Sequence, residues 1–251
     1  MPAFVTKLAR SSVVTLCLLL LSCSSVPKLE NNAITPKVKL PNKHKELAVM
    51  SAYSDPWEGF NRRMYYFNAK ADEYVLLPVV NSYKKITPDV VEIGLSNFFN
   101  NLAEISTFIN SLLQFKFSVA GETFARFVVN STLGMIGLVD VATPIGFAEQ
   151  NEDFGQTLGY WGVGAGPYLV LPLLGPSSLR DATGLAFDAL ADQQSMDVLG
   201  MKSDEEFYLS LVHSIDARSR LPFRYYASGS AFEYEYLKLL YMKLREIQVA
   251  R

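Results

Sequence analysis

The chain has 251 residues, of which 49% are hydrophobic and only 19% are charged, and its formal net charge is −2. The sequence contains no basic block of the kind that binds nucleic acids, so we exclude that class of protein. The hydrophobic fraction is high for a domain with an ordinary charged surface, which indicates apolar area that contacts lipid or a partner.

The first 22 residues have the pattern of a secretory signal peptide. Lys7 and Arg10 form a short positive region, and an apolar run over residues 11–21 follows it. A run of about 11 residues is too short for a membrane-spanning helix, which needs about 20. We therefore expect residues 1–22 to be removed and to form no part of the mature fold.

The signal ends in Leu-Leu-Ser-Cys at residues 20–23, which resembles the lipobox of bacterial lipoproteins. The resemblance implies that Cys23 becomes the first residue and carries a diacylglycerol and a further acyl chain such as palmitate. Several acyl chains together give lasting membrane anchoring. Ser24 implies the outer membrane, because an aspartate there is typical of retention at the inner membrane. The alternative is an ordinary signal with an incidental cysteine.

Residues 23–52 are predicted to be a flexible tether that begins with the lipidated cysteine. This segment contains three prolines and five lysines and has no apolar period. A flexible chain of this length reaches some 30 Å. Cys17 leaves with the signal, so the mature chain has no second cysteine and no intramolecular disulfide.

Residues 53–251 are expected to form one helical domain. Asp55, Pro56 and Glu58 have the order of an N-cap residue, a proline at the first helical position and a glutamate at the third. Apolar residues then recur at intervals of three and four, which places them on one face of an amphipathic helix. They are Trp57, Phe60, Met64, Phe67, Ala71 and Tyr74.

Similar signals predict further helices along the chain. A Thr-Pro pair at 87–88 opens one, and residues 118–131 form another with Gly134 as its stop. Capping signals at 203–206 and 230–233 begin the last two. The last helix carries the apolar residues Tyr236, Leu237, Leu240, Leu244 and Ile247. Strand-type alternation is scarce, so we predict an all-α domain of roughly eight to ten short helices.

Residues 159–176, GYWGVGAGPYLVLPLLGP, contain five glycines and three prolines among large apolar side chains. A phosphate-binding loop would be followed by a helix whose N-terminus meets the phosphates. Here Pro167, Pro172 and Pro176 interrupt any helix, so we expect no nucleotide site. The segment from Gly155 to Leu179 contains no charged residue, which leaves a buried loop and a lipid-contacting element as interpretations.

Residues suited to catalysis or metal binding are sparse. His44 lies in the tether and His213 in a predicted helix, and no Gly-x-Ser-x-Gly motif is present. Glu152 and Asp153 are neighbouring carboxylates, but their sequence is that of a polar loop. A zinc site needs three or four good ligands. We therefore expect that the protein is not an enzyme and that it binds no metal and no other cofactor.

Three stretches carry a family resemblance. They are DPWEGFNRRMYYFN at residues 55–68, GLSNFFNNLAE at 94–104, and a run within 126–181 that begins RFVVNSTLGMIGLVDVATPIGF and ends LPLLGPSSLRD. Together they resemble the MlaA (VacJ) family of outer-membrane lipoproteins. The motifs are long and occur in the same order and spacing as in the family, and the resemblance covers residues 55 to about 190.

The resemblance implies an all-α, ring-shaped bundle of short amphipathic helices around an amphipathic channel. Such a protein lies in the inner face of the outer membrane, lipid-anchored and facing the periplasm. Phospholipids misplaced in the outer leaflet would pass through it without catalysis, which maintains lipid asymmetry. The implied partners are phospholipids, outer-membrane porin trimers, and a periplasmic carrier that serves an inner-membrane transporter.

The resemblance also suggests roles for individual residues. Phe67 and Asn68 lie in a segment associated with control of the pore, and plain helix packing is the alternative for Phe67. Gly134 and Gly137 are candidates for a hinge beside the channel or for simple close packing.

Three charged candidates lie inside or beside apolar runs, where charges are usually paired or hydrated. They are Asp140, Arg180 and Asp181. Arg180 and Asp181 are interpreted first as an internal salt bridge and second as a contact to a lipid phosphate.

Two other functions remain open at this point. A structural or scaffolding envelope lipoprotein would have the same lipid anchor and tether but would transport no lipid. A lipid-modifying enzyme would need a nucleophile and a base, which the sequence does not reveal.

Overall fold

The structure, a computed structural model, describes residues 53–198, 203–227, 229–230 and 232–251, without the side chains of 191–198 and 203–204. These residues belong to one compact unit, Asn42–Arg251. Cys23, the predicted signal and the predicted tether lie outside the described residues, as do the side chains that begin the predicted capping box at 203–206.

The described part of the chain is mostly helical, which confirms the predicted fold class, and it also contains one short hairpin of two strands. In chain order the elements are α3 (Glu58–Ala71), the π-helix η1 (Asp72–Leu76), α4 (Leu77–Ile86), α5 (Asp89–Leu113), α6 (Phe117–Thr132), α7 (Phe154–Tyr160), β1 (Tyr168–Leu171), β2 (Gly175–Ser178), α8 (Leu179–Val198), α9 (Ser203–Arg220) and α10 (Glu233–Ala250). None of the described helices is both long and apolar enough to cross a bilayer.

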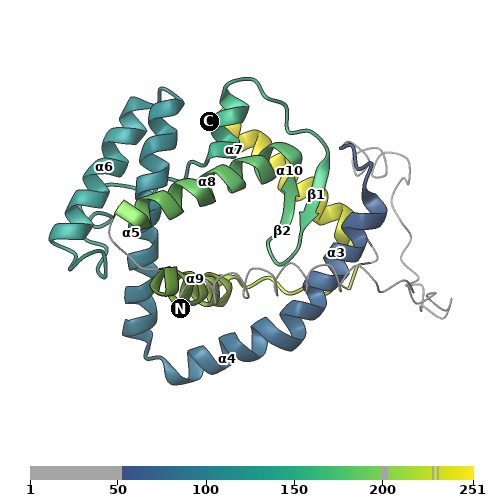
Figure 1. The fold of residues 1–251 in the computed structure, drawn as a ribbon, viewed down its shortest axis with the longest axis horizontal. Helices are drawn as coiled ribbons and strands as arrows, with labels where there is room; N and C mark the ends of the chain where they lie inside the picture. Colours follow the sequence, from purple (N-terminus) through teal and green to yellow (C-terminus); the bar gives the residue numbers. More distant parts are fainter. Residues whose placement is uncertain (1–52, 199–202, 228, 231) are drawn as a thin grey trace, which may run out of the picture. The chain divides into compact units, whose positions relative to one another are not determined.

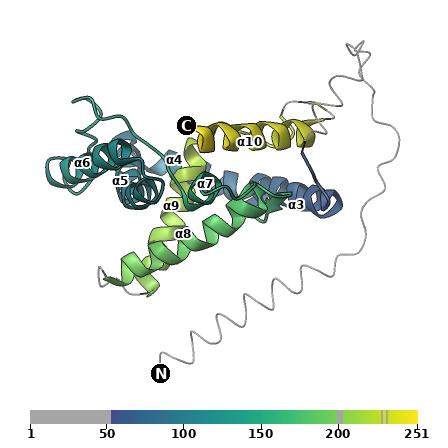
Figure 2. The same cartoon turned by 90° about the horizontal axis from the view of Figure 1, so that it is seen from above.

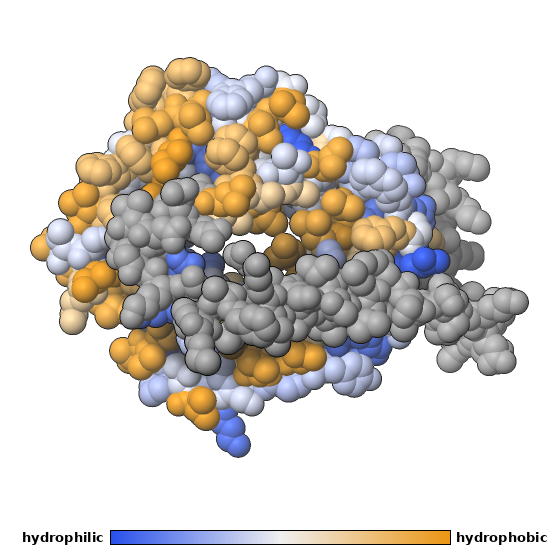
Figure 3. Space-filling view, in the orientation of Figure 1, coloured by the Kyte–Doolittle hydropathy of each residue, from blue (hydrophilic) through white to orange (hydrophobic). Residues whose placement is uncertain are grey.

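The helices of this unit are arranged around a central opening (Figure 1). Helices α3 and α4 form one side and α5 the other, with α7, α8 and the β1–β2 hairpin between their far ends. Helix α6 packs against the outer side of α5. Seen from above, α10 lies on one side of this arrangement while α8 slopes away on the other (Figure 2). An opening also remains near the centre of the space-filling view (Figure 3).

The start of α3 corrects a sequence prediction. The helix begins at Glu58 with Trp57 at the N-cap position, and no side chain caps it. The Asp55 carboxylate is used elsewhere: it accepts hydrogen bonds from Asn61 Nδ2 at 2.7 Å and from the Tyr234 hydroxyl at 2.6 Å. The predicted Asp55 cap was therefore wrong, because the carboxylate instead joins α3 to α10.

Other helix boundaries agree with the sequence. Helix α5 begins at Asp89 with Pro88 in the N-cap position, one residue later than the Thr-Pro pair predicted. Helix α6 ends at Thr132, and Gly134 follows it closely. Proline holds the extended backbone that precedes α5, and glycine permits the close turn after α6.

The glycine-rich segment folds differently from the predicted bent loop. Its first part ends α7, and its second part forms the antiparallel β1–β2 hairpin, in which Tyr168 pairs with Ser178 and Leu171 with Gly175. Tyr168 and Val170 point inward and are fully buried. Together with Tyr65 they belong to the small core of the described residues, which also contains Tyr234 and Met242.

Candidate functional site

The apolar stripes that the sequence predicted are largely exposed, and the buried faces of the same helices are largely polar. Along α3 and η1, Trp57 at the N-cap position, Phe60 and Tyr74 are exposed. The buried residues of that helix are Asn61, Tyr65, Asn68 and Ala69. On α10, the exposed side chains are Tyr236, Leu240, Leu244 and Ile247, whereas Glu233, Tyr234, Lys238, Met242 and Arg245 are buried.

This inverted polarity extends to the helical pair α5 and α6 and to the loop after it. Exposed apolar side chains cover the outer surface of the pair. In the loop, Leu133, Met135 and Ile136 are 70%, 67% and 73% exposed. The space-filling view shows hydrophobic residues spread over this side of the unit (Figure 3). An apolar exterior of this extent marks a surface that meets lipid or another protein.

A seam of polar side chains joins α5 to α6. Arg126 Nε donates to Glu104 Oε1 at 2.6 Å, and both side chains are only 2% exposed. Asn101 Nδ2 donates to Ser131 Oγ at 2.9 Å. Charges buried this deeply are tolerated only when they are paired and hydrogen-bonded. The seam therefore holds the pair together from within while apolar side chains face outward, as in helices that pack inside a membrane.

The loop after α6 is attached to the same seam through Asp140. Its carboxylate accepts hydrogen bonds from Asn130 Nδ2 at 3.1 Å and from the Thr143 N–H at 3.1 Å. Arg126 also lies 3.5 Å from Asp140. The predicted site residue Asp140 is thus a paired charge that fixes the loop.

Gly134 and Gly137 lie where the loop leaves no room for a side chain. A Cβ at Gly134 would lie 2.1 Å from the Val139 carbonyl oxygen, and one at Gly137 would lie 2.7 Å from Asn101 Nδ2. Gly137 also has a φ of 87°, a region that glycine enters without strain. The structure therefore shows close packing at both positions.

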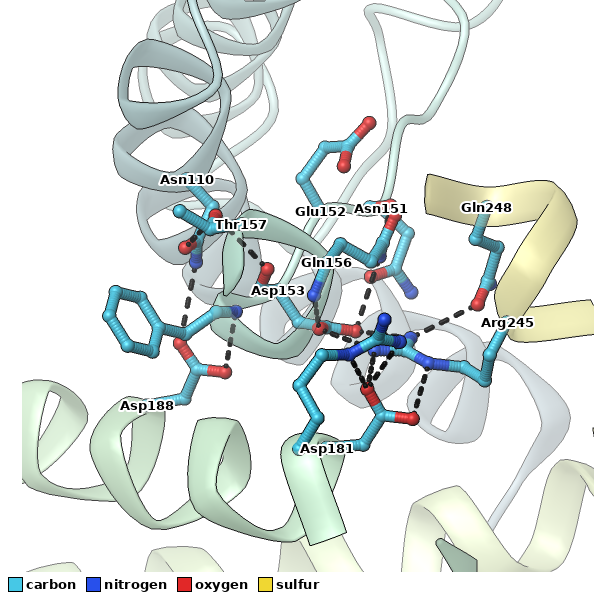
Figure 4. Close-up of polar contacts among 12 residues, drawn as sticks. Asn110, Asn151, Glu152, Asp153, Gln156, Thr157, Asp181, Asp188, Arg245 and Gln248 are labelled. Atoms are coloured by element: carbon cyan, nitrogen blue, oxygen red, sulfur yellow. Dashed lines mark hydrogen bonds and ion pairs between the residues drawn. The ribbon is translucent and has the colours of Figure 1, made fainter. Parts of the chain in front are cut away.

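A second polar network connects α7, α8 and α10, and Figure 4 shows its contacts. The Asp181 carboxylate accepts hydrogen bonds from Arg245 Nε at 3.0 Å and Nη2 at 2.9 Å, and from Arg180 Nη2 at 2.9 Å. Arg245 also pairs with Asp153, at 2.7 Å from Nη1. Arg180 and Asp181 are both buried, so they form an internal ion pair in this structure.

The charge balance of this network depresses the pKa of both carboxylates. Burial by itself would raise the pKa of Asp181, but the hydrogen bonds and positive charge of Arg245 outweigh it, and the pKa is lowered. The same competition lowers the pKa of Asp153. Both groups are therefore held in the charged form, which suits structural ion pairs more than proton transfer.

The network continues to α5 through Thr157 and Asp188. Thr157 Oγ1 donates to Asn110 Oδ1 at 2.8 Å, and the Phe154 N–H donates to the Asp188 carboxylate at 3.0 Å. Glu152 points away from this group in Figure 4 and pairs with Lys116 at 2.8 Å. The neighbouring carboxylates Glu152 and Asp153 thus serve separate ion pairs and do not face one another as an acid–base couple.

Two asparagines of α3 hold strand β1 by its backbone. Asn61 Nδ2 donates to the Tyr168 carbonyl at 3.0 Å, and its Oδ1 accepts from the Val170 N–H at 2.9 Å. Asn68, two helical turns further on, makes the equivalent pair with the Leu171 carbonyl at 2.9 Å and the Leu173 N–H at 2.7 Å.

The two amides occupy the backbone edge that a third strand would otherwise pair with. Phe67, the neighbour of Asn68, is half-buried and takes no part in this pairing. Of the two adjacent candidates, Asn68 is therefore the one that fixes the hairpin.

The sequence analysis missed Asn61, Glu104, Arg126 and Arg245. Their signal was present as a second period: polar residues recur at helical spacing opposite the apolar stripes. Within the described residues, no group of three or more His, Cys, Asp or Glu side chains is arranged to hold a metal ion.

Comparison with known proteins places this architecture in a family. The profile described as MlaA lipoprotein matches residues 53–248. The chain belongs to the MlaA lipoprotein family. An uncharacterized protein of Rickettsia conorii is 34% identical over 199 residues, which cover 78% of each chain.

Two further comparisons connect MlaA-family names and structures to this chain. An Escherichia coli protein named as the intermembrane phospholipid transport system lipoprotein MlaA is 43% identical over 135 residues, covering 52% of this chain and 54% of its own. A solved structure, described as the structural basis for maintenance of bacterial outer membrane lipid asymmetry, matches with a TM-score of 0.64 at 30% identity. The match covers 78% of this chain and 99% of the solved chain.

Proposed function

We propose that this MlaA-family protein is a passive conduit that moves mislocalised phospholipids from the outer leaflet of the outer membrane toward the periplasm. The observation that carries the proposal is the inverted polarity of helices arranged around an opening. Apolar side chains on the outside suit a lipid environment. Polar groups on the inside are tolerated at membrane depth where protein or water forms hydrogen bonds with them.

The chemistry of the cargo fits this arrangement. A phospholipid needs an apolar wall for its tails and a polar strip for its headgroup, and short amphipathic helices at the interface offer both. Movement along such a path requires no bond to form or break, so the proposal includes no catalytic residue and no cofactor. The intermembrane phospholipid transport named for the E. coli relative supports this proposal.

The location and partners follow from the lipid anchor and from the family. We propose that acylated Cys23 holds the protein at the inner face of the outer membrane. A porin trimer would contact part of the apolar exterior, and a soluble carrier would accept phospholipids on the periplasmic side. The exposed apolar side chains of α5, α6 and the following loop supply a surface of suitable character for membrane or porin contact.

The candidate residues have positioning roles in this proposal. Asp140, Gly134 and Gly137 fix the loop beside α6, and Asn68 fixes the hairpin at the opening. Asp181 holds α8 to α10 through Arg245, and Arg180 pairs with the same carboxylate. We therefore assign the Arg180–Asp181 pair to the frame of the conduit and not to headgroup binding.

The test is a bacterial strain that lacks the gene. A membrane-impermeant amine reagent should label more surface phosphatidylethanolamine in that strain, and the wild-type gene should restore the low level. Cys23→Ser should fail to restore it because the anchor is lost. Cys17→Ser is the matched control, since it changes the other cysteine of the chain, within the predicted signal, and should restore the low level.

Unchanged surface labelling in the deletion strain would contradict the conduit. A purely structural lipoprotein predicts weakened envelopes without a specific rise in outer-leaflet phospholipid. An enzyme predicts lysophospholipid or free fatty acid when purified full-length protein is incubated with phospholipid vesicles.

A further inference from the structure

The turn between β1 and β2 is an exposed apolar tip placed at the central opening. Figure 1 shows this turn at the inner edge of the ring of helices. Its side chains Leu173 and Leu174 are 59% and 67% exposed, although the strands behind them are anchored in the buried core. Large apolar side chains in such a position do not stabilise the fold by burial.

The tip also holds a strained backbone. Leu173 has a φ of 64°, a left-handed conformation that is uncommon and costly for a residue with a branched side chain. Gly175, which ends the turn, has a φ of 84°. Strain of this kind persists only where the surroundings impose it, and it is concentrated at functional positions.

Asn68 is the group that imposes this conformation. It is 3% exposed, and its amide bonds to the end of β1 at the Leu171 carbonyl and to the turn itself at the Leu173 N–H. On the other side, the Tyr225 hydroxyl lies 3.7 Å from where a Cβ of Gly175 would be. The tip is therefore a positioned element and not a loosely attached loop.

We propose that the β1–β2 tip is the narrow point of the lipid path, where acyl chains slide against Leu173 and Leu174, and that Asn68 is its positioning residue. The inference rests on the proposed conduit function and specifies which residues of the conduit contact the tails. On this proposal the two hydrocarbon tails pass the tip in contact with its leucines.

The experiment uses the full-length acylated protein in phosphatidylcholine vesicles that contain a trace of fluorescent phospholipid. It measures the rate at which the labelled phospholipid moves through the protein. Leu174 is varied because its exposure is high and its φ is ordinary. Leu174→Ala should raise the rate and Leu174→Trp should lower it, each by about tenfold, the change expected from a modest shift in barrier height.

The matched controls are Leu190→Ala and Leu190→Trp on α8, where the leucine has a similar exposure of 65%. They should leave the rate unchanged. A wild-type protein that moves no label overturns the conduit itself. A wild-type protein that moves label while both Leu174 variants match the Leu190 variants overturns the proposal for the tip.

The role of Asn68 is tested against Asn61, which makes the same kind of backbone pair further along β1. Asn61→Ala and Asn68→Ala should lower the thermal midpoint by similar amounts. Only Asn68→Ala should reduce the difference in rate between the Ala and Trp variants of Leu174. Equal effects of the two asparagine variants on that difference would overturn the positioning role.

Discussion

Two regions of this protein hold their helices together with different interiors. The pair α5 and α6 is joined by polar side chains, with Arg126 and Glu104 at its centre and apolar residues outside. The region around α3, α10 and the hairpin also packs Tyr65 and Tyr168 against Tyr234 in T-shaped, edge-to-face pairs. The difference lies in the interior: both regions expose apolar side chains, but the first is joined by paired buried charges and the second also contains a cluster of packed aromatic rings.

The strongest way to break this comparison is to remove a charge from the polar seam. Arg126→Leu leaves the buried Glu104 without its partner, and we expect about 3–5 kcal/mol of lost stability. The measurement is the free energy of unfolding in detergent micelles.

A double variant with Leu at both 104 and 126 sharpens the same test. It removes both buried charges, so much of the loss should be recovered. A single Arg126→Leu variant as stable as the wild type would show that the seam does not hold the two helices together.

The next largest effect is expected at the loop after α6. Gly134→Ala places a Cβ 2.1 Å from the Val139 carbonyl oxygen and 2.5 Å from that of Asn130, so the backbone must shift. We expect a loss of about 3 kcal/mol, the upper range for overpacking. Thermal unfolding measures it.

Gly121→Ala is the matched control for that substitution. Gly121 lies within α6, and apart from its chain neighbours and the backbone of its own helix nothing lies within 4 Å of the position that a Cβ would take there, so the change should stabilise the helix by up to about 1 kcal/mol. A loss at Gly121 equal to that at Gly134 would remove the steric explanation.

A smaller effect is expected in the aromatic region. Tyr234→Phe removes the hydrogen bond to the Asp55 carboxylate, and we expect about 1.5–3 kcal/mol, since the acceptor is charged. Tyr236→Phe changes an exposed hydroxyl on the same helix and should cost little. Chemical denaturation of both variants gives the comparison, and equal costs would mean that the Asp55 contact adds nothing.

The last prediction concerns pH. The folded-state pKa of Asp181 is lowered, so its stabilising contribution is present above the unfolded pKa, near 4, and is lost as the pH falls through the folded value. Wild-type protein should therefore lose more stability between pH 7 and pH 3 than Asp181→Asn does. Denaturation curves of both proteins at both pH values measure this. An equal loss of stability in the two proteins would mean that the ion pair with Arg245 is not formed.

Periodicity in the sequence was enough to predict most helices and their apolar faces. It did not show which face would be buried, because a period defines a face and not the medium that the face meets. The two strands of the hairpin were missed because each has four residues, β1 lies between two prolines, and β2 itself begins with glycine and proline. Their pairing depends on Asn61 and Asn68, which lie about a hundred residues away.

Long-range partners explain the other differences between sequence and structure. Asp55 has the sequence context of a helix cap, yet its carboxylate is drawn to Tyr234 on the last helix. Arg245 lies beyond the part of the chain where the family motifs were found, and its two partners, Asp153 and Asp181, lie at the starts of two other helices. Contacts of this kind are set by the tertiary fold, so no local sequence pattern predicts them.

The polar seam between α5 and α6 has a consequence for the order of biogenesis. Either helix alone in hydrocarbon would carry Glu104 or Arg126 without a counter-charge, a costly state. The two helices are therefore expected to fold into a hairpin in water, or at the headgroup layer, before any part of them enters hydrocarbon. Insertion would then be the docking of a finished unit, which the acyl chains proposed at Cys23 would deliver to the bilayer surface.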